Sequence, residues 1–224
     1  MKKRILIIAA HPDDEVLGAG GAIAKHVDAG DEVYCLILGE GVTSRQGALK
    51  QGIAKLRHEA QAAAKILGFK EIVFSSFPDN SFDSVPLLKI IKEIEGHLAK
   101  IKPHIVYTHY ENDLNVDHRR TFRAVMTICR PCNDFCPEEV YSFEVLSSTE
   151  WQSKLRKNFN PNFYIDIKNT LDRKKKALKK YKSEIRQYPH SRSVKGVEVL
   201  ARYRGLEAGL EFAEAFHLVK KIKK

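Results

Sequence analysis

A short apolar run that ends abruptly in charged residues constrains this chain more than any other feature. Residues 5–10 are continuous, apolar and rich in β-branched side chains, which is typical of a strand buried on both faces. The next residues are His11, Pro12, Asp13, Asp14 and Glu15. Ligands of open parallel sheets bind outside the carboxyl ends of the strands, so this segment predicts a chemical site. A helix start is the alternative, because acids cap helices and favour their dipole, but it leaves the histidine, the proline and the third acid unexplained.

Strand and helix patterns alternate along most of the chain. The predicted strands are 5–10, 32–38, 72–77, 104–109 and 162–167, and the predicted helices are 16–29, 54–67, 86–100, 118–129, 171–187 and 197–216. Residues 39–52 hold several glycines and are expected to form a mobile loop at the edge of the sheet that also bears His11. Repeated β-α units predict an α/β fold with a Rossmann-like, mostly parallel sheet, helices on both faces and the C-terminal helices packed on the same domain.

The 224-residue length and the absence of a linker predict a single domain over residues 1–219, followed by a basic tail at 220–224. The N-terminal apolar run is too short for a signal peptide, and no run approaches the roughly 20 apolar residues of a membrane span. We therefore expect a cytoplasmic protein without a membrane span.

The net charge of +10 reflects 38 basic and 28 acidic residues, and the basic runs 173–180 and 220–224 account for much of this excess. Such runs are usually solvated helix faces or frayed tails. Their functional interpretation is attraction of an anionic small molecule, such as a phosphorylated or nucleotide-linked substrate. Aromatic residues do not interleave with the basic ones, so we expect no nucleic-acid partner.

The opening charged segment suggests a divalent metal. His11 and Asp14 combine an imidazole with a carboxylate, which suits zinc or another first-row metal better than magnesium. Asp13 is then free to act as a general base toward water. A catalytic zinc needs a third protein ligand, and His118 follows a later strand whose end lies at the same edge of the sheet.

Two neighbours of this third ligand have open roles. Asp117 is placed to orient an imidazole ligand through its other nitrogen. His109, at the end of the strand 104–109, is the second choice for the third ligand, and an ordinary buried histidine is an equally good interpretation of it.

The four cysteines admit a thiol site. Cys129 and Cys132 have CxxC spacing and Cys136 follows closely, but a structural zinc site needs a fourth ligand and only Cys35, on a predicted strand, remains. We expect ordinary reduced cysteines.

These motifs resemble those of the PIG-L/LmbE-like zinc-dependent de-N-acetylases. The resemblance rests most specifically on residues 10–15 and on Asp117-His118, and it extends less specifically to segments 57–59, 67–68, 77–79, 141–145, 188–193, 204–209 and 213–216. It implies a Rossmann-like fold, a zinc ion and removal of acetyl from an N-acetylated amino sugar of the N-acetylglucosamine type or its conjugate. It is also compatible with homo-oligomers, although no stretch of this sequence demonstrates an interface.

Carried over position by position, the resemblance implies that His11, Asp14 and His118 hold the metal and that Asp13 is the base. One departure concerns Asn115, because many family members have a histidine three residues before the last ligand. An asparagine amide can donate a hydrogen bond to an oxyanion but cannot act as a general acid. His190 is therefore the candidate for a proton donor or a substrate contact.

Substrate identity is expected to come from the loops at the strand ends. Arg45 and Arg192 in such segments are candidates for binding a carboxylate or phosphate of the substrate, and each is equally compatible with an ordinary surface arginine.

Two other functions fit the sequence. A nucleotide- or sugar-binding module could use Gly18, Gly20 and Gly21, but these lack the GxGxxG form and follow acids that repel phosphate. A magnesium-dependent phosphatase could use the Asp13-Asp14 pair, and it predicts oxygen-only coordination with no need for His118.

Overall fold

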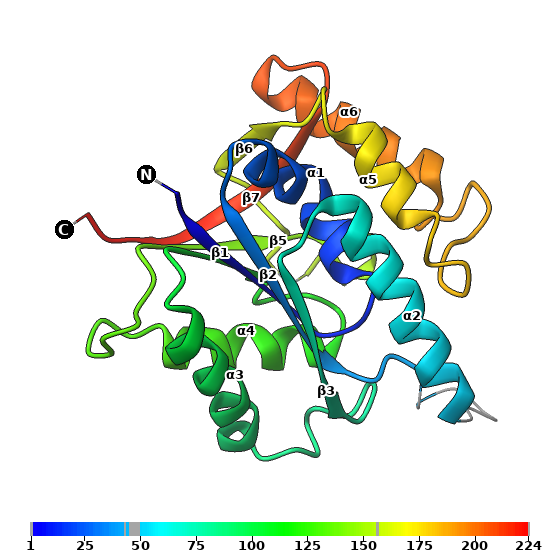
Figure 1. The fold of residues 1–224 in the computed structure, drawn as a ribbon. Helices are drawn as coiled ribbons and strands as arrows, with labels where there is room; N and C mark the ends of the chain where they lie inside the picture. Colours follow the sequence, from blue (N-terminus) through cyan, green and yellow to red (C-terminus); the bar gives the residue numbers. More distant parts are fainter. Residues whose placement is uncertain (1, 43, 45–49, 156, 224) are drawn as a thin grey trace.

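The chain forms one seven-stranded mixed sheet between two layers of helices (Figure 1). The computed structural model describes residues 2–42, 44, 50–155 and 157–223. Its elements are β1 (Arg4–Ala9), α1 (Asp14–Asp28), β2 (Glu32–Gly39), α2 (Lys50–Leu67), β3 (Glu71–Phe77), α3 (Leu87–Ile101), β4 (Ile105–His109), α4 (Val116–Ile128), β5 (Glu139–Phe143), the short 3-10 helix η1 (Thr149–Trp151), β6 (Phe163–Asp166), α5 (Leu171–Leu178), α6 (Val194–Ala208) and β7 (Ala213–Lys221).

The strand order is β3-β2-β1-β4-β5-β7-β6. Strands β1 to β5 are mutually parallel, and β7 runs antiparallel between β5 and β6. The predicted α/β fold with a mostly parallel sheet is confirmed. Because β1 and β4 are neighbours, the loops that leave their carboxyl ends lie side by side.

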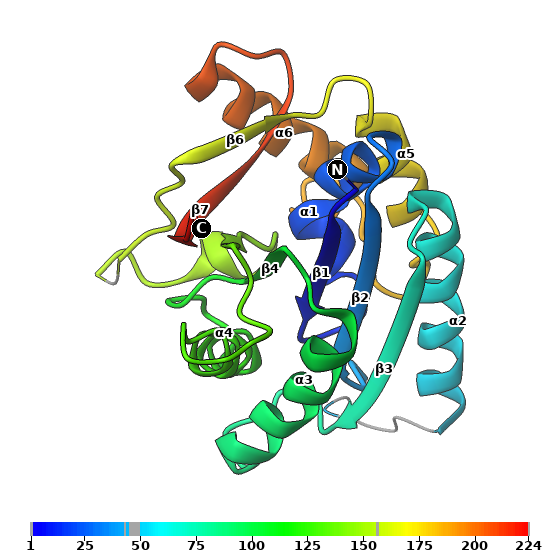
Figure 2. The same ribbon diagram turned by 60° about the vertical axis from the view of Figure 1, so that its left-hand side comes forward.

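The central strand β1 is buried on both faces, as its sequence predicts. Ile5 and Ile7 belong to a core shared with α1, α2, α5 and α6, whereas Leu6 and Ile8 belong to a second core shared with α3 and α4. The two helical layers lie on opposite sides of the sheet in both ribbon views (Figures 1 and 2).

The C-terminal third differs from the prediction. The predicted helix 197–216 is wrong in its second half, because α6 ends at Ala208, Gly209 adopts φ 70°, and β7 begins at Ala213. The Ala- and Glu-rich composition favours a helix, but pairing with β5 and β6 on either side overrides that preference. The predicted helix 171–187 ends early, at Leu178, and β5 was not predicted from the sequence.

Strand β7 also reaches further than the sequence suggests. It continues through Lys220 and Lys221, the first two residues of the expected basic tail, and Lys221 pairs with Glu139 of β5. Among the described residues, no helix is long and apolar enough to cross a membrane.

The C-terminal elements hold α1 through a buried ion pair, here called the α1 clamp, made by Lys174 of α5 and Glu214 of β7. The lysine Nζ lies 2.6 Å from Glu214 Oε1 and donates to the Leu17 carbonyl at 2.8 Å. The glutamate accepts the backbone N–H groups of Gly21 and Ala22 at 2.8 and 2.7 Å. The clamp therefore binds both backbone groups that would form the Gly21-to-Leu17 helical hydrogen bond.

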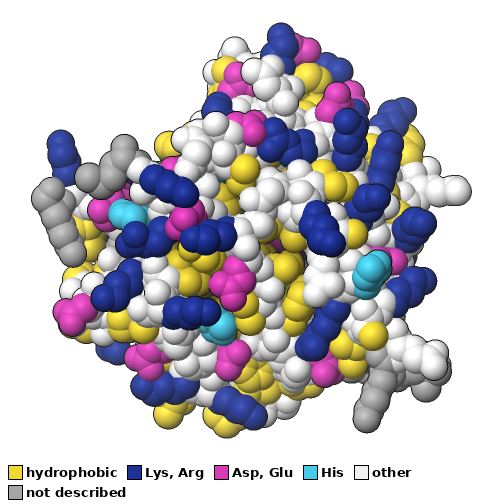
Figure 3. Space-filling model, viewed as in Figure 1, with side chains coloured by type: hydrophobic (Ala, Val, Ile, Leu, Met, Phe, Trp, Pro, Cys, Tyr) yellow, Lys and Arg dark blue, Asp and Glu magenta, His cyan; other side chains and the backbone are white. Residues whose placement is uncertain are grey.

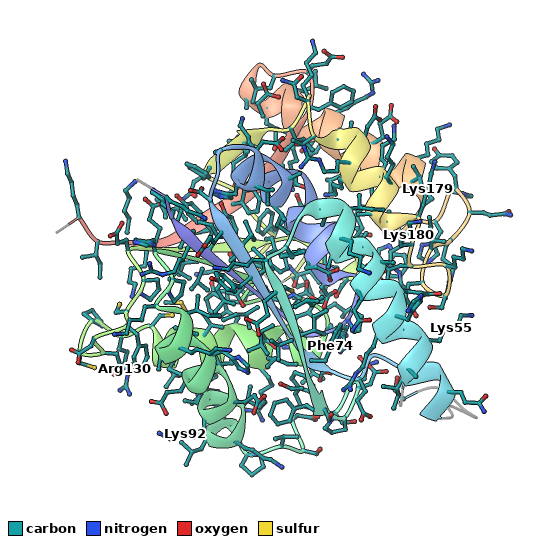
Figure 4. The ribbon with its side chains drawn as sticks, in the orientation of Figure 1. Lys55, Phe74, Lys92, Arg130, Lys179 and Lys180 are labelled. Carbon is teal, nitrogen blue, oxygen red and sulfur yellow. The ribbon has the colours of Figure 1, made fainter. Side chains whose placement is uncertain are left out.

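Basic side chains gather on the outer surface of α2 and α5 (Figure 3). Lys55 on α2, and Lys179 and Lys180 at the end of α5, project away from the body of the protein (Figure 4). The solvated-face interpretation of the run 173–180 holds for Lys179 and Lys180, whereas Lys174 of that run is buried in the α1 clamp.

Candidate metal centre

Two adjacent loops bring the three predicted metal ligands together. His11 lies in the β1–α1 connection, Asp14 is the first residue of α1, and His118 lies in the first turn of α4. Asp14 Oδ2 lies 3.5 Å from His11 Nδ1 and 3.4 Å from His118 Nε2. One ligand atom from each residue lies within 4.8 Å of the others, and this two-nitrogen, one-oxygen donor set suits a first-row divalent metal.

Both imidazoles are held from behind by carboxylates. His11 Nε2 lies 2.9 Å from Asp117 Oδ2, and His118 Nδ1 lies 3.0 Å from Asp113 Oδ1. A carboxylate on the outer nitrogen fixes the ring and directs the other nitrogen's lone pair at the metal position. Asp117 contacts His11 from a distant part of the chain.

Asp113 was not predicted from the sequence as a site residue. It is fully buried and accepts the hydroxyl groups of Ser148 and Thr149, the latter at 2.5 Å. It lies in the connection between β4 and α4, five residues before His118. Ligand histidines usually need a carboxylate partner, and that need is the signal that could have identified Asp113.

His109 is close to this cluster but is engaged elsewhere. Its Nε2 accepts the backbone N–H of Ala10 at 2.8 Å, which occupies the lone pair that a metal would need. Its ring stacks on His118 with 3.9 Å between centroids. Among the described residues, neither group that could hold a metal includes His109. A packing role therefore fits His109 better than a role as a metal ligand.

Positive charge is strongly favoured between the carboxylates. Burial lowers the pKa of His11, but hydrogen bonds to Asp117 and Asp14 outweigh it and raise that pKa to about 10. Burial likewise lowers the pKa of His118, and the charges of Asp14 and Asp113 raise it to about 9. A bound cation replaces such protons when it coordinates neutral imidazoles.

A second group of His11, Asp79 and Asp117 could also hold a metal. His11 Nε2 faces it, 3.3 Å from Asp79 Oδ1. Because the same ring presents Nδ1 to Asp14, His11 belongs to both groups, and only the first combines two imidazoles with a carboxylate.

Asp13 occupies a strained and buried position beside the cluster. Its φ is 106°, a region that costs a non-glycine residue roughly 1–3 kcal/mol, and such strain concentrates at functional sites. Glu15 accepts the Asp13 N–H at 3.1 Å and the hydroxyl of Tyr181, which gives the third acid of the opening segment a structural role.

The electrostatic surroundings of Asp13 favour its protonated form. Burial and the negative charge of Asp14 raise the pKa of Asp13 well above its usual value, while Arg192 opposes this shift. An Arg192 guanidinium nitrogen lies 3.5 Å from Asp13 Oδ2 and 3.4 Å from Glu184 Oε2. Glu184, which lines the same space, was not identified from the sequence.

The remaining predicted site residues lie at different distances from this cluster. Asn115 caps α4, its Oδ1 accepts from the Asp117 N–H at 2.7 Å, and its Nδ2 donates to Asn80 Oδ1 at 2.8 Å. His190 lies in the loop before α6, where its Nδ1 accepts the Arg192 N–H at 3.1 Å. Arg45 falls outside the described residues.

A cavity of about 190 Å³ opens onto the cluster. Its wall is mostly polar, and its lining includes all three predicted metal ligands with Asp13, Asn115 and Arg192: His11, Pro12, Asp13, Asp14, Leu17, Gly41, Ser44, Asp79, Asn80, Asn115, His118, Val145, Leu146, Ser147, Ser148, Glu184 and Arg192. Asp13, the three candidate ligands and Arg192 therefore face one small space.

The glycines behind the nucleotide-binding alternative serve helix packing. A Cβ on Gly18 would lie 2.3 Å from the Phe143 ring, and one on Gly21 would lie 2.6 Å from Ile167. These close approaches leave no room for a side chain at Gly18 or Gly21, so no bound nucleotide is needed to explain the glycines.

The cysteines are all free thiols. The Cys136 thiol donates to the Cys129 carbonyl at 3.2 Å, and no cysteine joins a potential metal group among the described residues.

Comparison with known proteins supplies independent evidence. A protein-family model described as PIG-L: GlcNAc-PI de-N-acetylase matches residues 6–129. The chain is 26% identical to the diacetylchitobiose deacetylase of Thermococcus kodakarensis, over 97% of this chain and 83% of that protein. It is 29% identical to the 4-oxalmesaconate hydratase of Pseudomonas putida, over 79% of this chain and 72% of the relative.

A solved structure shows the same fold. The N,N'-diacetylchitobiose deacetylase from Pyrococcus horikoshii superposes with a TM-score of 0.78 at 23% identity, covering 97% of this chain and 84% of that one.

Proposed function

This chain belongs to the PIG-L family, and from that premise we propose that it is a zinc-dependent hydrolase that removes the acetyl group from an N-acetylated amino sugar of the N-acetylglucosamine type or its conjugate. The deacetylase relative supports the reaction and the sugar substrate, and the hydratase relative makes addition of water across a C=C bond the competing reaction.

One observation carries the proposal. His11, Asp14 and His118 converge within 4.8 Å, and each histidine has a carboxylate on its other nitrogen. Such backing is typical of a metal centre, because it fixes the tautomer of each ligand. The two-histidine set also argues against a magnesium phosphatase, which would need oxygen ligands.

In this proposal His11, Asp14 and His118 hold the ion, with zinc as the best fit to the donor set. When bound, it supplies a Lewis acid that polarises the acetamide carbonyl and acidifies water.

Asp13 is assigned as the general base. It lines the cavity next to Asp14, and its raised pKa makes it a better proton acceptor than an ordinary aspartate. The carboxylate takes a proton from the attacking water, and the same carboxyl group can then return that proton to the leaving amine nitrogen. Arg192, 3.5 Å away, opposes the rise in the pKa of Asp13 and so favours the ionised form that the first step needs.

Asn115 and His190 are assigned to contacts with the oxyanion and the substrate. Asn115 lines the cavity and its amide is fixed by Asn80 and the Asp117 N–H, so it is assigned to donate a hydrogen bond to the developing oxyanion. His190 is outside the cavity wall, and burial together with Arg192 lowers its pKa, so it fits a substrate contact better than a proton donor.

The substrate's variable part is assigned to the cationic side of the cavity. Arg192 offers the guanidinium that could bind an anionic group on the sugar conjugate, and Arg45 remains a prediction for the same role.

The test is acetate release from a panel of N-acetylated sugars, with zinc content measured in the same samples. We expect Asp13→Asn to lower kcat by about 10²–10⁴-fold while retaining the metal, and His118→Ala to lose both metal and activity. Asp172→Asn, an exposed acid on α5, is the matched control and should leave both unchanged.

Two results would contradict this function. Hydration of an unsaturated polycarboxylate such as 4-oxalmesaconate, without acetate release, would assign the hydratase reaction instead. Phosphate release that persists in His118→Ala would restore the phosphatase alternative.

A further inference from the structure

We propose that Trp151 and His190 form a binding subsite for a second pyranose ring, next to the ring that carries the acetamide. This inference rests on the proposed function, and it specifies the substrate as at least a disaccharide.

The cavity is too small to enclose such a substrate. Its volume of about 190 Å³ is below the roughly 300–1,000 Å³ of typical small-molecule pockets. It can surround the acetamide and the ring that bears it, so any further ring must lie on the rim.

Trp151 stands on that rim. Ser147 and Ser148 line the cavity, and Trp151, in η1 directly after them, donates its backbone N–H to the Ser148 carbonyl at 3.2 Å. From the other side, the ring of His190 meets the indole edge-on, with 5.4 Å between centroids and 69° between planes. His190 is two residues from Arg192, another lining residue.

The indole is left open to the outside. Trp151 is 54% exposed, although a tryptophan is the largest apolar side chain and is usually well covered. An exposed aromatic face beside a polar cavity offers apolar contact at little cost in conformational entropy. The C–H face of a pyranose ring is a flat apolar surface of matching shape.

His190 adds a directed polar group to this face. Because its Nδ1 accepts the Arg192 N–H at 3.1 Å, a neutral His190 carries its proton on Nε2. Among the described residues no hydrogen bond engages this Nε2, so it is available to donate to a sugar hydroxyl.

The loop around His190 is also held in place. The His190 N–H donates to the Gln187 carbonyl and the His190 carbonyl accepts from the Ser193 N–H, both at 3.0 Å. An apolar platform with a fixed donor beside it suits a neutral sugar, whereas a phosphate would call for a guanidinium such as that of Arg192 in the cavity wall.

Trp151 is the sole tryptophan of the sequence, so intrinsic emission at 295 nm excitation reports on this position alone. The metal-loaded protein is titrated with glucosamine and with its β-1,4-linked disaccharide, which are the deacetylated products and do not turn over. We expect the disaccharide to shift the emission to shorter wavelength with saturation and to bind about tenfold more tightly than glucosamine. His190→Ala should weaken binding of the disaccharide only.

Kinetics give a second, independent measurement. Trp151→Ala should raise KM for diacetylchitobiose about tenfold, leave kcat within twofold, and leave KM for N-acetylglucosamine unchanged. Trp151→Phe should recover most of the loss. Tyr203→Ala removes a similarly exposed aromatic, 53% exposed on α6, and should change neither substrate.

The outcomes separate this inference from the proposed function. Acetate release from diacetylchitobiose with no change in emission, or an equal loss for both sugars in Trp151→Ala, refutes the subsite and leaves the deacetylase standing. A saturable shift with the disaccharide but no acetate release supports the subsite and refutes the reaction. Absence of both refutes both.

Discussion

Replacing Asp113 by asparagine tests how the metal centre is built without touching a metal ligand. The carboxylate is fully buried and accepts from His118 Nδ1 at 3.0 Å, from the hydroxyl groups of Ser148 and Thr149, and from the Asn115 N–H at 2.9 Å. Asp113→Asn keeps the volume but puts an NH₂ group where only donors converge.

The expected loss can be estimated in two ways. Removing the carboxylate behind a ligand histidine typically weakens metal binding by about 10- to 100-fold, or roughly 1.4–2.7 kcal/mol. Leaving one buried donor of Ser148 or Thr149 unsatisfied costs the apo protein about 1–3 kcal/mol of stability. Both losses should appear together, because one side chain provides both contacts.

Zinc affinity is measured by competition with a chromophoric chelator, and stability by urea denaturation of the apo protein. Glu111→Gln changes an exposed acid of the same loop and is the matched control. Zinc affinity in Asp113→Asn within twofold of wild type would refute the claim that this carboxylate orients His118.

The lowered pKa of Asp113 predicts that the stability of the apo protein depends on pH. Burial raises the pKa of Asp113, but the charge of His118 and the hydrogen bonds outweigh it, and the pKa falls to about 2 from an ordinary 3.8. A lowered folded-state pKa gives stability that is present above about pH 4 and lost as the pH falls toward 2, about 2 kcal/mol in all. Asp113→Asn should flatten this part of the apo protein's pH–stability curve, and an unchanged slope would contradict the assignment.

Three further predictions test the packing and the charge around the site. Gly18→Ala should destabilise the protein by about 1–3 kcal/mol in urea, because its Cβ would overlap a ring of β5, whereas Gly96→Ala in the exposed middle of α3 has open space and should stabilise it by about 0.5–1 kcal/mol. Glu214→Gln leaves the lysine of the α1 clamp uncompensated and should cost about 3–5 kcal/mol; a Tm near wild type would show that the pair is not needed. Arg192→Gln removes the positive charge that lowers the pKa of Asp13, so the acid limb of kcat/KM should move to higher pH, while Arg192→Lys should hold it in place.

Local sequence patterns were sufficient to predict the first half of the fold. Strand β1 and its charged continuation are contiguous in sequence, and the parallel order of β1 and β4 follows from repeated β-α units, so the meeting of His11, Asp14 and His118 could be expected.

The missed features depend on contacts that sequence spacing does not encode. Asp113 meets Ser148 across 35 residues, and the direction of each side chain decides the contact. Residues 213–216 have a helical composition, and only the space between β5 and β6 makes them a strand.

The family match covers one part of the site, and residues outside the match supply another part. The family match ends at residue 129 and already contains all three candidate metal ligands and Asp13. Other partners of the opening segment come from beyond residue 129: Tyr181 hydrogen bonds to Glu15, Arg192 approaches Asp13, and the α1 clamp binds α1 one turn further on.

The C-terminal third therefore contacts the same loop that bears Asp13, and it also supplies Trp151 and His190 near the cavity. A substitution in this third can change the pKa of Asp13 or the ring bound beside the cavity while the metal ligands stay in place. The relatives' names differ in activity, one a deacetylase and one a hydratase, and residues outside the matched region are where we expect such differences to arise.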